Sequence, residues 1–313
     1  MKGKILITPR AFAKSDGTQV KRLEEKGYCV HVNETGKSYS YDEFIKLSKD
    51  VEGIIIGVDE ADENMLQHAN KLKAIAKYGV GVDNIDLNAA KKQGIKISRT
   101  VGSNSVSVAE HAISLMFALE KNIVSNCLSV KNGQWDKSYS TEMKDKTIGI
   151  IGFGNIGKEV VRIAQGIGMN VYAHDLYPID VEYAKKHNVK ISTFEELITN
   201  SDVITVHLPL TETTQSLINK EVFKKMKPTS IIINAARGGV VNENDLFDAL
   251  SSKEIAGAGF DVFSKEPPVT TEPLLQLDNF ILTPHTASKT KEADENTMRL
   301  AVENIMKDLE GIS

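Results

Sequence analysis

The stretch from Thr147 to Asp175 reads T-I-G-I-I-G-F-G-N-I-G-K-E-V-V-R-I-A-Q-G-I-G-M-N-V-Y-A-H-D. Its first apolar run predicts a buried strand, and a G-x-G-x-x-G pattern follows at the beginning of a helical pattern. A second apolar run then ends on Asp175. A strand, a glycine-rich turn, a helix and a second strand in this order predict a βαβ unit that binds a dinucleotide.

The three glycines of this pattern have different physical roles. Gly152 permits the tight turn that leaves the strand, and Gly154 lacks the Cβ that would block a pyrophosphate. Gly157 lets the helix pack closely on the strand, and the helix N-terminus offers unpaired N–H groups to phosphates. A purely structural turn is the alternative, because glycines cluster in turns for many reasons, but the flanking strand and helix favour dinucleotide binding.

Asp175 and the residue after it indicate which dinucleotide is bound. A carboxylate at the end of the second strand accepts hydrogen bonds from both ribose hydroxyls and repels a 2′-phosphate. The next residue is Leu176, and no arginine follows closely to receive such a phosphate. The pattern therefore favours NAD over NADP, with an ordinary surface acid at a strand end as the alternative.

The chain of 313 residues is long for a single core and divides naturally into two domains. Short apolar runs alternate with helical patterns along its whole length, which predicts parallel sheets and an α/β fold. The strands predicted in the first domain are Lys4–Thr8, Cys29–Val32, Gly53–Gly57, Leu72–Tyr78 and Ile95–Arg99. Six are predicted in the second, at Ile148–Ile151, Asn170–Ala173, Val203–Leu208, Ser230–Asn234, Ala256–Asp261 and Phe280–Thr283.

Two long helical patterns complete this organisation. The first runs from Ser105 to about Val130, and we expect it to carry the chain from one domain to the other because no flexible linker precedes the dinucleotide unit. His111 lies on it and is interpreted as a packed core or interface residue rather than as a substrate contact. The second pattern, Lys289–Leu309, comes too late to extend the sheet and is expected to return to the first domain.

Composition excludes several classes of protein. The net charge of −4 comes from interspersed acids and bases, which argues against a nucleic-acid or membrane partner. Cys29 and Cys127 have apolar neighbours and no C-x-x-C pairing, so we expect buried thiols in a reducing compartment and no metal site. The N-terminus lacks the pattern of a signal peptide, and no window reaches the length of a membrane span. A cytoplasmic location is therefore expected.

Three polar residues follow predicted strands or lie in the adjoining loops, where ligands bind in open parallel sheets. Arg237 closes I-I-I-N-A-A-R-G-G, and its planar guanidinium suits a carboxylate bidentately. His285 ends I-L-T-P-H, and histidine transfers protons near neutral pH. Glu266, in D-V-F-S-K-E-P-P, could hydrogen-bond the imidazole and favour its charged form. Taken singly, Arg237 could be a surface ion pair, His285 a capped loop residue and Glu266 a solvated acid. Together they predict a catalytic site.

These residues carry a resemblance to the D-isomer-specific 2-hydroxyacid dehydrogenase family, whose Arg, Glu and His catalytic set matches Arg237, Glu266 and His285. Within this family the sequence is most similar to the phosphoglycerate dehydrogenase branch. The resemblance spans nearly the whole chain and includes K-Y-G-V-G-V-D-N-I-D from Lys77, S-N-S-V-S-V-A-E-H from Ser103, and V-H-L-P-L-T from Val206.

The resemblance implies two Rossmann-like or flavodoxin-like parallel-sheet domains with a cleft between them. Residues 1–100 with 286–313 would form the substrate domain, and 101–285 the NAD-binding domain. It also implies a homodimer in which the helix after Ser105 forms much of the contact. The resemblance implies that the substrate is bound by Tyr78, Gly79, Val80, Gly81 and Arg237. It implies that the cofactor is bound by Gly152, Gly154, Asn155, Ile156, Gly157, Asp175, His207, Pro209, Asn234, Ala235, Ala236 and Asp261. Of these, Asp261 would face the nicotinamide carboxamide.

The implied activity is NAD-dependent hydride transfer at C2 of a small 2-hydroxy or 2-keto acid, with 3-phosphoglycerate as one candidate. A phosphorylated substrate would need a basic residue in the loop Gly57–Asp62, but this loop is acidic and would repel a phosphate. The alternative is therefore a general glyoxylate or hydroxypyruvate reductase. Lys77 is a possible anion contact, although a lone lysine is more often a solvated charge. Arg99 replaces a common asparagine and could serve a second anionic group, with a hinge ion pair as the alternative.

A different class of function stays open, because a transcriptional corepressor in this family retains the same catalytic residues. The rival interpretation is an NAD-sensing scaffold that binds partner peptides. The sequence lacks interaction tails, which favours the enzyme, and nothing after Leu309 suggests a regulatory domain for feedback inhibition.

Overall fold

A computed structural model describes residues 2–135 and 137–311, which form two compact units. The first unit runs up to Asn104 and resumes at Thr290, and the second comprises Ser105–Lys289. Among the described residues, no helix has the length and apolar character needed to cross a bilayer.

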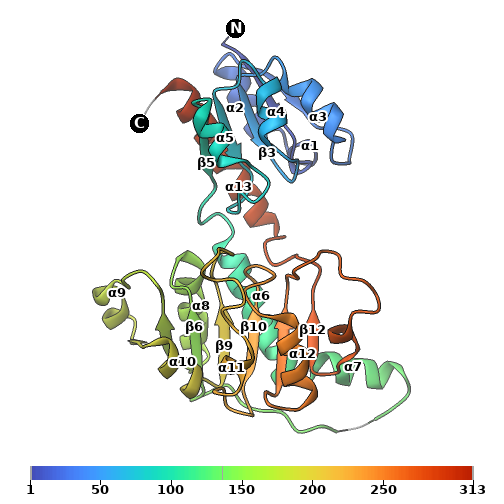
Figure 1. The fold of residues 1–313 in the computed structure, drawn as a ribbon, viewed down its shortest axis with the longest axis vertical. Helices are drawn as coiled ribbons and strands as arrows, with labels where there is room; N and C mark the ends of the chain where they lie inside the picture. Colours follow the sequence, from blue (N-terminus) through green and yellow to red (C-terminus); the bar gives the residue numbers. More distant parts are fainter. Residues whose placement is uncertain (1, 136, 312–313) are drawn as a thin grey trace. The chain divides into compact units, whose positions relative to one another are not determined.

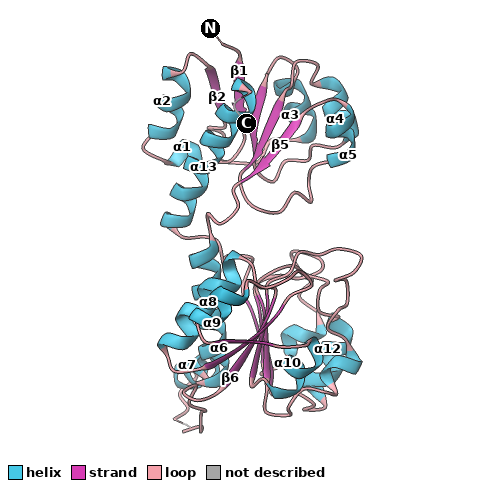
Figure 2. Cartoon of the chain, turned by 90° about the vertical axis from the view of Figure 1, so that its left-hand side faces the viewer, coloured by secondary structure: helices cyan, strands magenta, loops and turns pink. Residues whose placement is uncertain are grey.

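In the described part of the first unit, five parallel strands form a sheet in the order β2-β1-β3-β4-β5. The helices cover both faces of this sheet (Figures 1 and 2). The strands are β1 (Lys4–Ile7), β2 (Cys29–Val32), β3 (Gly53–Ile56), β4 (Ala74–Lys77) and β5 (Lys96–Arg99). The helices are α1 (Ala11–Lys14), α2 (Thr18–Glu25), α3 (Tyr41–Ser48), α4 (Glu63–His68), α5 (Leu87–Lys92) and α13 (Lys291–Glu310).

Helix α13 confirms the prediction that the last helical pattern returns to the first unit. Its side chains Met298, Ala301, Val302 and Ile305 are buried in one cluster with apolar residues of the sheet. The helix begins with Thr290 as its N-cap, whose side chain accepts a hydrogen bond from the amide of Ala293. One face of this sheet is therefore covered by a segment distant in the sequence.

The second unit contains a parallel sheet of seven strands among its described residues, in the order β12-β11-β10-β9-β6-β7-β8. The strands are β6 (Thr147–Ile151), β7 (Asn170–His174), β8 (Val189–Ile191), β9 (Val203–Val206), β10 (Ile231–Asn234), β11 (Gly257–Phe260) and β12 (Phe280–Leu282). The helices are α6 (Ser105–Glu120), α7 (Ile123–Lys131), α8 (Asn155–Gly166), α9 (Val181–Lys186), α10 (Phe194–Asn200), α11 (Lys220–Phe223) and α12 (Glu243–Ser251), and a 3-10 helix, η1, spans Pro273–Gln276.

The order of these strands indicates one end of the sheet as the place for a ligand. Strands β7 and β8 extend the sheet on one side of β6, and β9 to β12 extend it on the other. The direction of winding therefore reverses at β6 and β9, and in open α/β sheets ligands bind beyond the carboxyl ends of the strands at such a reversal. The glycine pattern follows β6 at that end.

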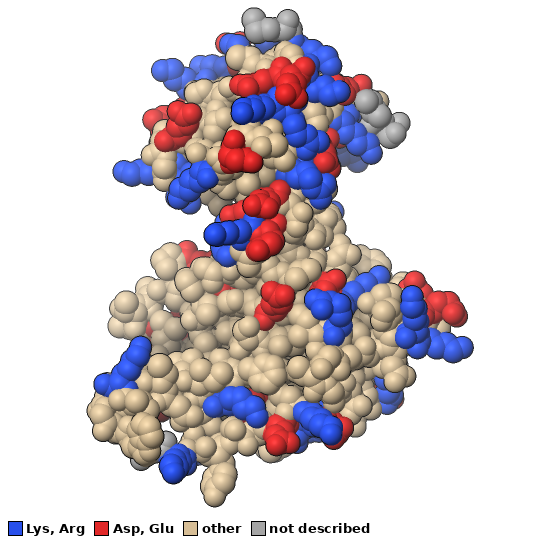
Figure 3. Space-filling view, turned by 180° about the vertical axis from the view of Figure 1, so that it is seen from behind, with Lys and Arg blue, Asp and Glu red and all other residues tan. Residues whose placement is uncertain are grey.

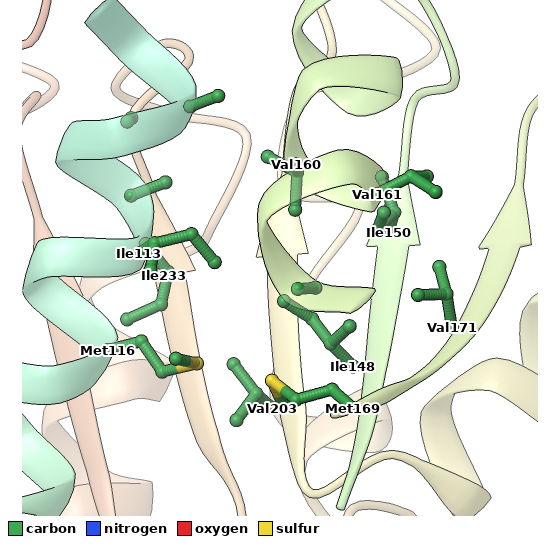
Figure 4. Packing of buried hydrophobic residues seen from close by; sticks show 14 of the residues in the cluster. Ile113, Met116, Ile148, Ile150, Val160, Val161, Met169, Val171, Val203 and Ile233 are labelled. Atoms are coloured by element: carbon green, nitrogen blue, oxygen red, sulfur yellow. The ribbon is translucent and has the colours of Figure 1, made fainter. Parts of the chain in front are cut away.

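Apolar side chains of α6, α8 and the sheet form the largest core of this unit. Figure 4 shows Ile113 and Met116 from α6 and Val160 from α8 pointing toward the strands that carry Ile148 and Ile233. On the opposite face a second cluster joins the sheet to α10, α11 and α12. Burial on both faces explains why the central strands read as short, nearly continuous apolar runs.

Three expectations from the sequence need correction. The predicted helix from Ser105 to Val130 is two helices, because Asn122 between α6 and α7 adopts a left-handed backbone with φ of 50°. The second sheet has a seventh strand, the short edge strand β8. Cys29 and Cys127 are free, as expected, but both are exposed and not buried.

Charged side chains are spread over the surface in mixed signs. Figure 3 shows acidic and basic residues interspersed on the face that it presents, in both units, while uncharged side chains cover most of that face of the second unit. Helix α7 contributes exposed apolar residues to the second unit, including Ile123, Val124 and Leu128.

Candidate active site

The glycine turn after β6 has the close contacts that its sequence predicts. Gly152 has φ of +96°, and a Cβ there would lie 2.5 Å from the carbonyl oxygen of His207. A Cβ on Gly157 would lie 2.5 Å from the carbonyl oxygen of Gly152. Apart from Gly154 itself and its two neighbours in the chain, no described residue has an atom within 4 Å of the position that a Cβ of Gly154 would occupy. The turn is therefore tight where the backbone crosses itself and open at the N-terminus of α8, as a pyrophosphate requires.

Asp175 is fixed beside this turn at the end of β7. One carboxylate oxygen accepts from the amide of Phe153 at 2.6 Å, and the other from the amide of Tyr177 at 2.9 Å. A cavity of about 240 Å³ adjoins it, and apart from His174 and Asp175 its lining is apolar: Ile151, Leu176, Phe194, Leu208 and Leu217. An apolar slot with a carboxylate at its edge fits an adenine ring with its ribose, so these residues suit a dinucleotide.

His207 directly follows β9 and is half-buried, with its Nδ1 shielded from solvent. Its Nε2 lies 2.9 Å from Oγ1 of Thr205, while Nδ1 has no hydrogen-bond partner among the described residues. Burial lowers the pKa of His207 to about 4, because the charged imidazolium is costly to desolvate. The ring is therefore neutral at physiological pH and leaves one buried polar atom to be satisfied.

Asn234 shapes the loop that carries Arg237. Its side-chain amide donates to the carbonyl of Arg237 at 3.0 Å, and its carbonyl oxygen accepts from the amide of Ala236 at 3.1 Å. The half-buried guanidinium donates to the carbonyl of Ala236 at 2.8 Å. A Cβ on Gly238 would lie only 2.1 Å from the carbonyl of Phe263, so glycine is needed where this loop packs against the segment leading to Glu266.

His285 and Glu266 form a directly bonded pair, as the sequence predicts. Imidazole Nδ1 lies 2.7 Å from Oε2 of Glu266, and the other carboxylate oxygen accepts from the amide of Phe263 at 2.9 Å. The two side chains are 49% and 38% exposed. The carboxylate thus directs the proton of the neutral ring to Nδ1 and leaves Nε2 with a lone pair.

Other predicted residues have additional or different contacts. Asp261 is buried, and both its carboxylate oxygens accept hydrogen bonds from the loop around His285.

In the first unit the amide of Gly79 donates to Oγ1 of Thr100 at 2.9 Å. Lys77 is buried rather than solvated, and its ammonium donates to the carbonyl of Gly57 and to Oδ1 of Asn84, both at 2.5 Å. Arg99 is exposed at the end of β5.

Sequence reasoning did not find the contacts that hold the His285 loop. Thr283, Thr286 and Ala287 bond to Asp261, and His111 lies beside them from α6. The available signal was the spacing of Ser107 and His111, one helical turn apart on the same face of the helix.

Comparisons with known proteins agree with this geometry. Residues 113–287 match the family model described as D-isomer specific 2-hydroxyacid dehydrogenase, NAD binding domain. The D-3-phosphoglycerate dehydrogenase of Archaeoglobus fulgidus is 42% identical over 293 residues, which are 93% of this chain and 55% of that protein. The chain thus spans little more than half the length of that relative.

Two further relatives match over most of their length. The hydroxypyruvate reductase of Thermotoga maritima is 38% identical over 88% of this chain and 90% of that protein. The structure described as the pyruvate reductase of Chlamydomonas reinhardtii superposes with a TM-score of 0.84 at 29% identity, covering 98% of this chain and 96% of that one. The predicted fold class and the predicted NAD cofactor are confirmed, and the chain belongs to the D-isomer specific 2-hydroxyacid dehydrogenase family.

Proposed function

We propose that the protein is an NAD-dependent oxidoreductase that transfers hydride between NAD(H) and C2 of a small 2-hydroxy or 2-keto acid. The observation that carries this proposal is the 2.7 Å contact between His285 and Glu266, which lies in the same unit as a dinucleotide-type glycine turn. An imidazole with one nitrogen bonded to a carboxylate is suited to moving a proton at the other nitrogen.

Residues of the second unit would hold the cofactor. The amides of Asn155 and Ile156 belong to the first turn of α8, next to the open position at Gly154, and would bind the phosphates that a helix N-terminus favours. Asp175 would accept from the ribose hydroxyls, and the neutral His207 with Pro209, Asn234, Ala235, Ala236 and Asp261 would line the remainder. When bound, NAD supplies the acceptor for the hydride that leaves C2.

His285 would move the proton of the reacting hydroxyl group. In oxidation the neutral imidazole accepts that proton at Nε2, and in reduction the imidazolium donates it to the keto oxygen. Glu266 keeps Nδ1–H as a donor and stabilises the charge that the ring gains. Because Glu266 is itself held by the amide of Phe263, the ring is oriented through two successive hydrogen bonds.

Arg237 would hold the substrate carboxylate and polarise the carbonyl at C2. Its guanidinium is placed by Asn234, and its fork matches two carboxylate oxygens. Negative charge that develops on the substrate oxygen would also be stabilised by this cation. In the first unit, the amides of Val80 and Gly81 would contribute to carboxylate binding. Those of Tyr78 and Gly79 donate to the carbonyl of Ile56 and to Oγ1 of Thr100, so these two residues would shape the loop.

The substrate is best tested with a panel that separates phosphorylated from unphosphorylated acids. Two acids of the loop after β3 serve the fold: Asp62 caps α4 by accepting from the amide of Met65, and Asp59 is buried against the hydroxyl of Thr8. Glu60 is exposed and would repel a phosphate. Lys77 is already bonded to two protein oxygens, so a phosphorylated substrate would need Arg99 or a rearranged Lys77.

The test of the proposal is NADH oxidation followed at about 340 nm, the coenzyme's absorbance band, with phosphohydroxypyruvate, hydroxypyruvate, glyoxylate, pyruvate and a bulky branched 2-keto acid. We expect turnover with at least one acid, and a loss of about 10²-fold or more in His285→Ala with NADH affinity nearly unchanged. His31→Ala, which removes an exposed histidine of β2, is the matched control. Near-normal turnover in His285→Ala refutes the assignment, and silence of the wild type across the panel supports the scaffold alternative.

We also propose that the protein is a homodimer joined through α7. None of the residues in α7, all of them described, is buried, and Ile123 and Leu128 are 53% and 54% exposed. Apolar side chains gathered on one helix are costly to leave in water, and a second copy of the chain would cover them. Light scattering should give twice the chain mass for the wild type and for Val181→Glu, an exposed position of α9, but a monomer for Leu128→Glu.

A cytoplasmic location is the last part of the proposal. Both cysteines are free and exposed, which is typical of proteins kept in a reducing compartment. Labelling of unreduced protein from cells with a thiol reagent should modify Cys29 and Cys127 fully. A disulfide-linked species before lysis would contradict this location.

A further inference from the structure

The loop that carries His285 is held from both sides by one buried carboxylate. Asp261, directly after β11, is 1% exposed. Its Oδ1 accepts from Oγ1 of Thr283 at 2.6 Å and from the amide of Thr286 at 2.8 Å, and its Oδ2 accepts from the amide of Ala287 at 2.7 Å. These donors precede and follow His285 in the sequence, so the carboxylate determines the path of the loop through that residue.

This restraint matters because His285 has an unusual backbone conformation. Its φ is +53°, in the left-handed region that residues other than glycine adopt uncommonly. Its own amide donates to the carbonyl of Thr283 at 2.9 Å, which closes a narrow turn. Such a conformation persists only when the surrounding contacts require it.

His111 of α6 also contacts Thr283 and Asp261. Its Nε2 lies 2.9 Å from Oγ1 of Thr283 and 3.4 Å from Oδ1 of Asp261. A threonine hydroxyl has one proton, and the shorter contact to an ionised carboxylate takes that proton. The hydroxyl must therefore accept from His111, which fixes the proton of this imidazole on Nε2.

A second residue of α6 contacts the same loop. Oγ of Ser107 donates to the carbonyl of Ala287 at 2.6 Å. Ser107 and His111 are separated by one helical turn, so they point from the same face of α6. One bonds to the loop after His285 and the other to the residue two positions before it.

We propose that His111 is a positioning residue for His285: by donating to Thr283, it completes the hydrogen bonds through which Asp261 fixes the His285 loop. The inference rests on the proposed catalytic role of His285. Without the imidazole, the Thr283 hydroxyl loses its donor, and Asp261 loses the N–H group that α6 places 3.4 Å from its Oδ1. The loop then samples arrangements in which Nε2 of His285 is displaced from the reacting oxygen, and the chemical step slows.

The test compares His111→Ala and His111→Gln, whose amide reaches as far as the imidazole Nε2, with Ser114→Ala as the matched control. Ser114 is exposed on α6 and its hydroxyl bonds only within that helix, to the carbonyl of Glu110. With the best 2-keto acid of the panel, kcat should fall about 10- to 100-fold in His111→Ala, since small displacements of catalytic groups have effects of this size. KM for NADH should stay within about threefold, and His111→Gln should recover most of the loss.

A kinetic isotope effect separates positioning from a general loss of structure. With NADH deuterated at the transferred hydrogen, the isotope effect on kcat should rise in His111→Ala, because hydride and proton transfer become slower than product release. Thr283→Val keeps the side-chain shape but removes both the contact with His111 and the bond to Asp261, so its kcat should fall at least as far as that of His111→Ala. The double variant should be no slower than Thr283→Val, since that variant already lacks the contact with His111.

Two results overturn the inference. One is His111→Ala with kcat within about twofold of the wild type. The other is a loss of kcat of equal size in His111→Ala and His111→Gln, accompanied by a lower melting temperature in both variants and by an unchanged isotope effect. His285→Ala, measured alongside, distinguishes the two proposals: if it keeps turnover, the proposed function fails, whereas if it is inactive and His111→Ala is normal, only this inference fails.

Discussion

Replacing His207 with glutamine should make the stability of the second unit less sensitive to acid. Desolvation in the folded protein lowers the pKa of the wild-type imidazole to about 4, whereas an unfolded chain has the ordinary value of about 6.5. Above about pH 6.5 the ring is neutral in both states, and its titration contributes nothing to the pH dependence. As the pH falls from about 6.5 to 4, only the unfolded chain takes up the proton, so stability is lost over this window.

The size of the effect follows from the difference between the two pKa values. One unit corresponds to about 1.4 kcal/mol, so the free energy of unfolding should fall by about 3 kcal/mol over the whole window. Between pH 7 and pH 5 the part due to His207 is about 2 kcal/mol. His207→Gln removes this part and leaves the pH dependence due to all other groups.

The assay is urea unfolding followed by circular dichroism at several pH values between 7 and 5, with the two units fitted as separate transitions where they separate. Thr205→Val is the matched control, because it removes the hydroxyl at 2.9 Å from Nε2 but keeps the ring. It should lower stability at every pH and keep the steep wild-type slope. Equal slopes in the wild type and His207→Gln would refute the reasoning, since the ring would then be no harder to protonate in the folded protein.

Three further predictions concern the cofactor, a loop and the core. Asp175→Asn should weaken NADH binding about tenfold in a fluorescence titration and reduce the ratio of NADH affinity to NADPH affinity. An unchanged ratio would contradict the role of this carboxylate. Gly238→Ala forces a Cβ to within 2.1 Å of the Phe263 backbone, so thermal unfolding should show a loss of about 1–3 kcal/mol together with reduced kcat; wild-type values for both would contradict the close contact. Ile150→Ala, at a fully buried position of β6, should cost about 2–5 kcal/mol by urea unfolding, and a cost below about 1 kcal/mol would show that the core repacks.

The central strands were predictable because both of their faces are buried. Such strands read as short apolar runs bounded by polar residues, and β3 or β10 can be located from the sequence to within about one residue of its ends. The edge strand β8 was missed because V-K-I has three residues and two of them are exposed. The break at Asn122 was missed because the apolar spacing of a helix continues across it.

Within the candidate site, the pairing of Glu266 with His285 could be predicted from chemistry and from their places after strands. The contacts of Asp261 with Thr286 and Ala287, and of His111 with Thr283, could not. They join segments far apart in the sequence, and they depend on the path of a loop that no periodic pattern specifies. The prediction that both cysteines are buried was wrong for a similar reason, since apolar neighbours in the sequence do not show which way a side chain points.

The division of the first unit into two segments affects the order in which the protein is made. Until the ribosome has synthesised α13, the sheet residues Ile5, Ile7 and Ile55 lack the helix that buries them with Met298 and Val302. The second unit, Ser105–Lys289, is complete before α13 emerges and is able to fold while the earlier segment waits. We therefore expect the second unit to fold before the first, which reverses the usual order along a chain, and we expect the early apolar sheet to be exposed to aggregation until α13 arrives.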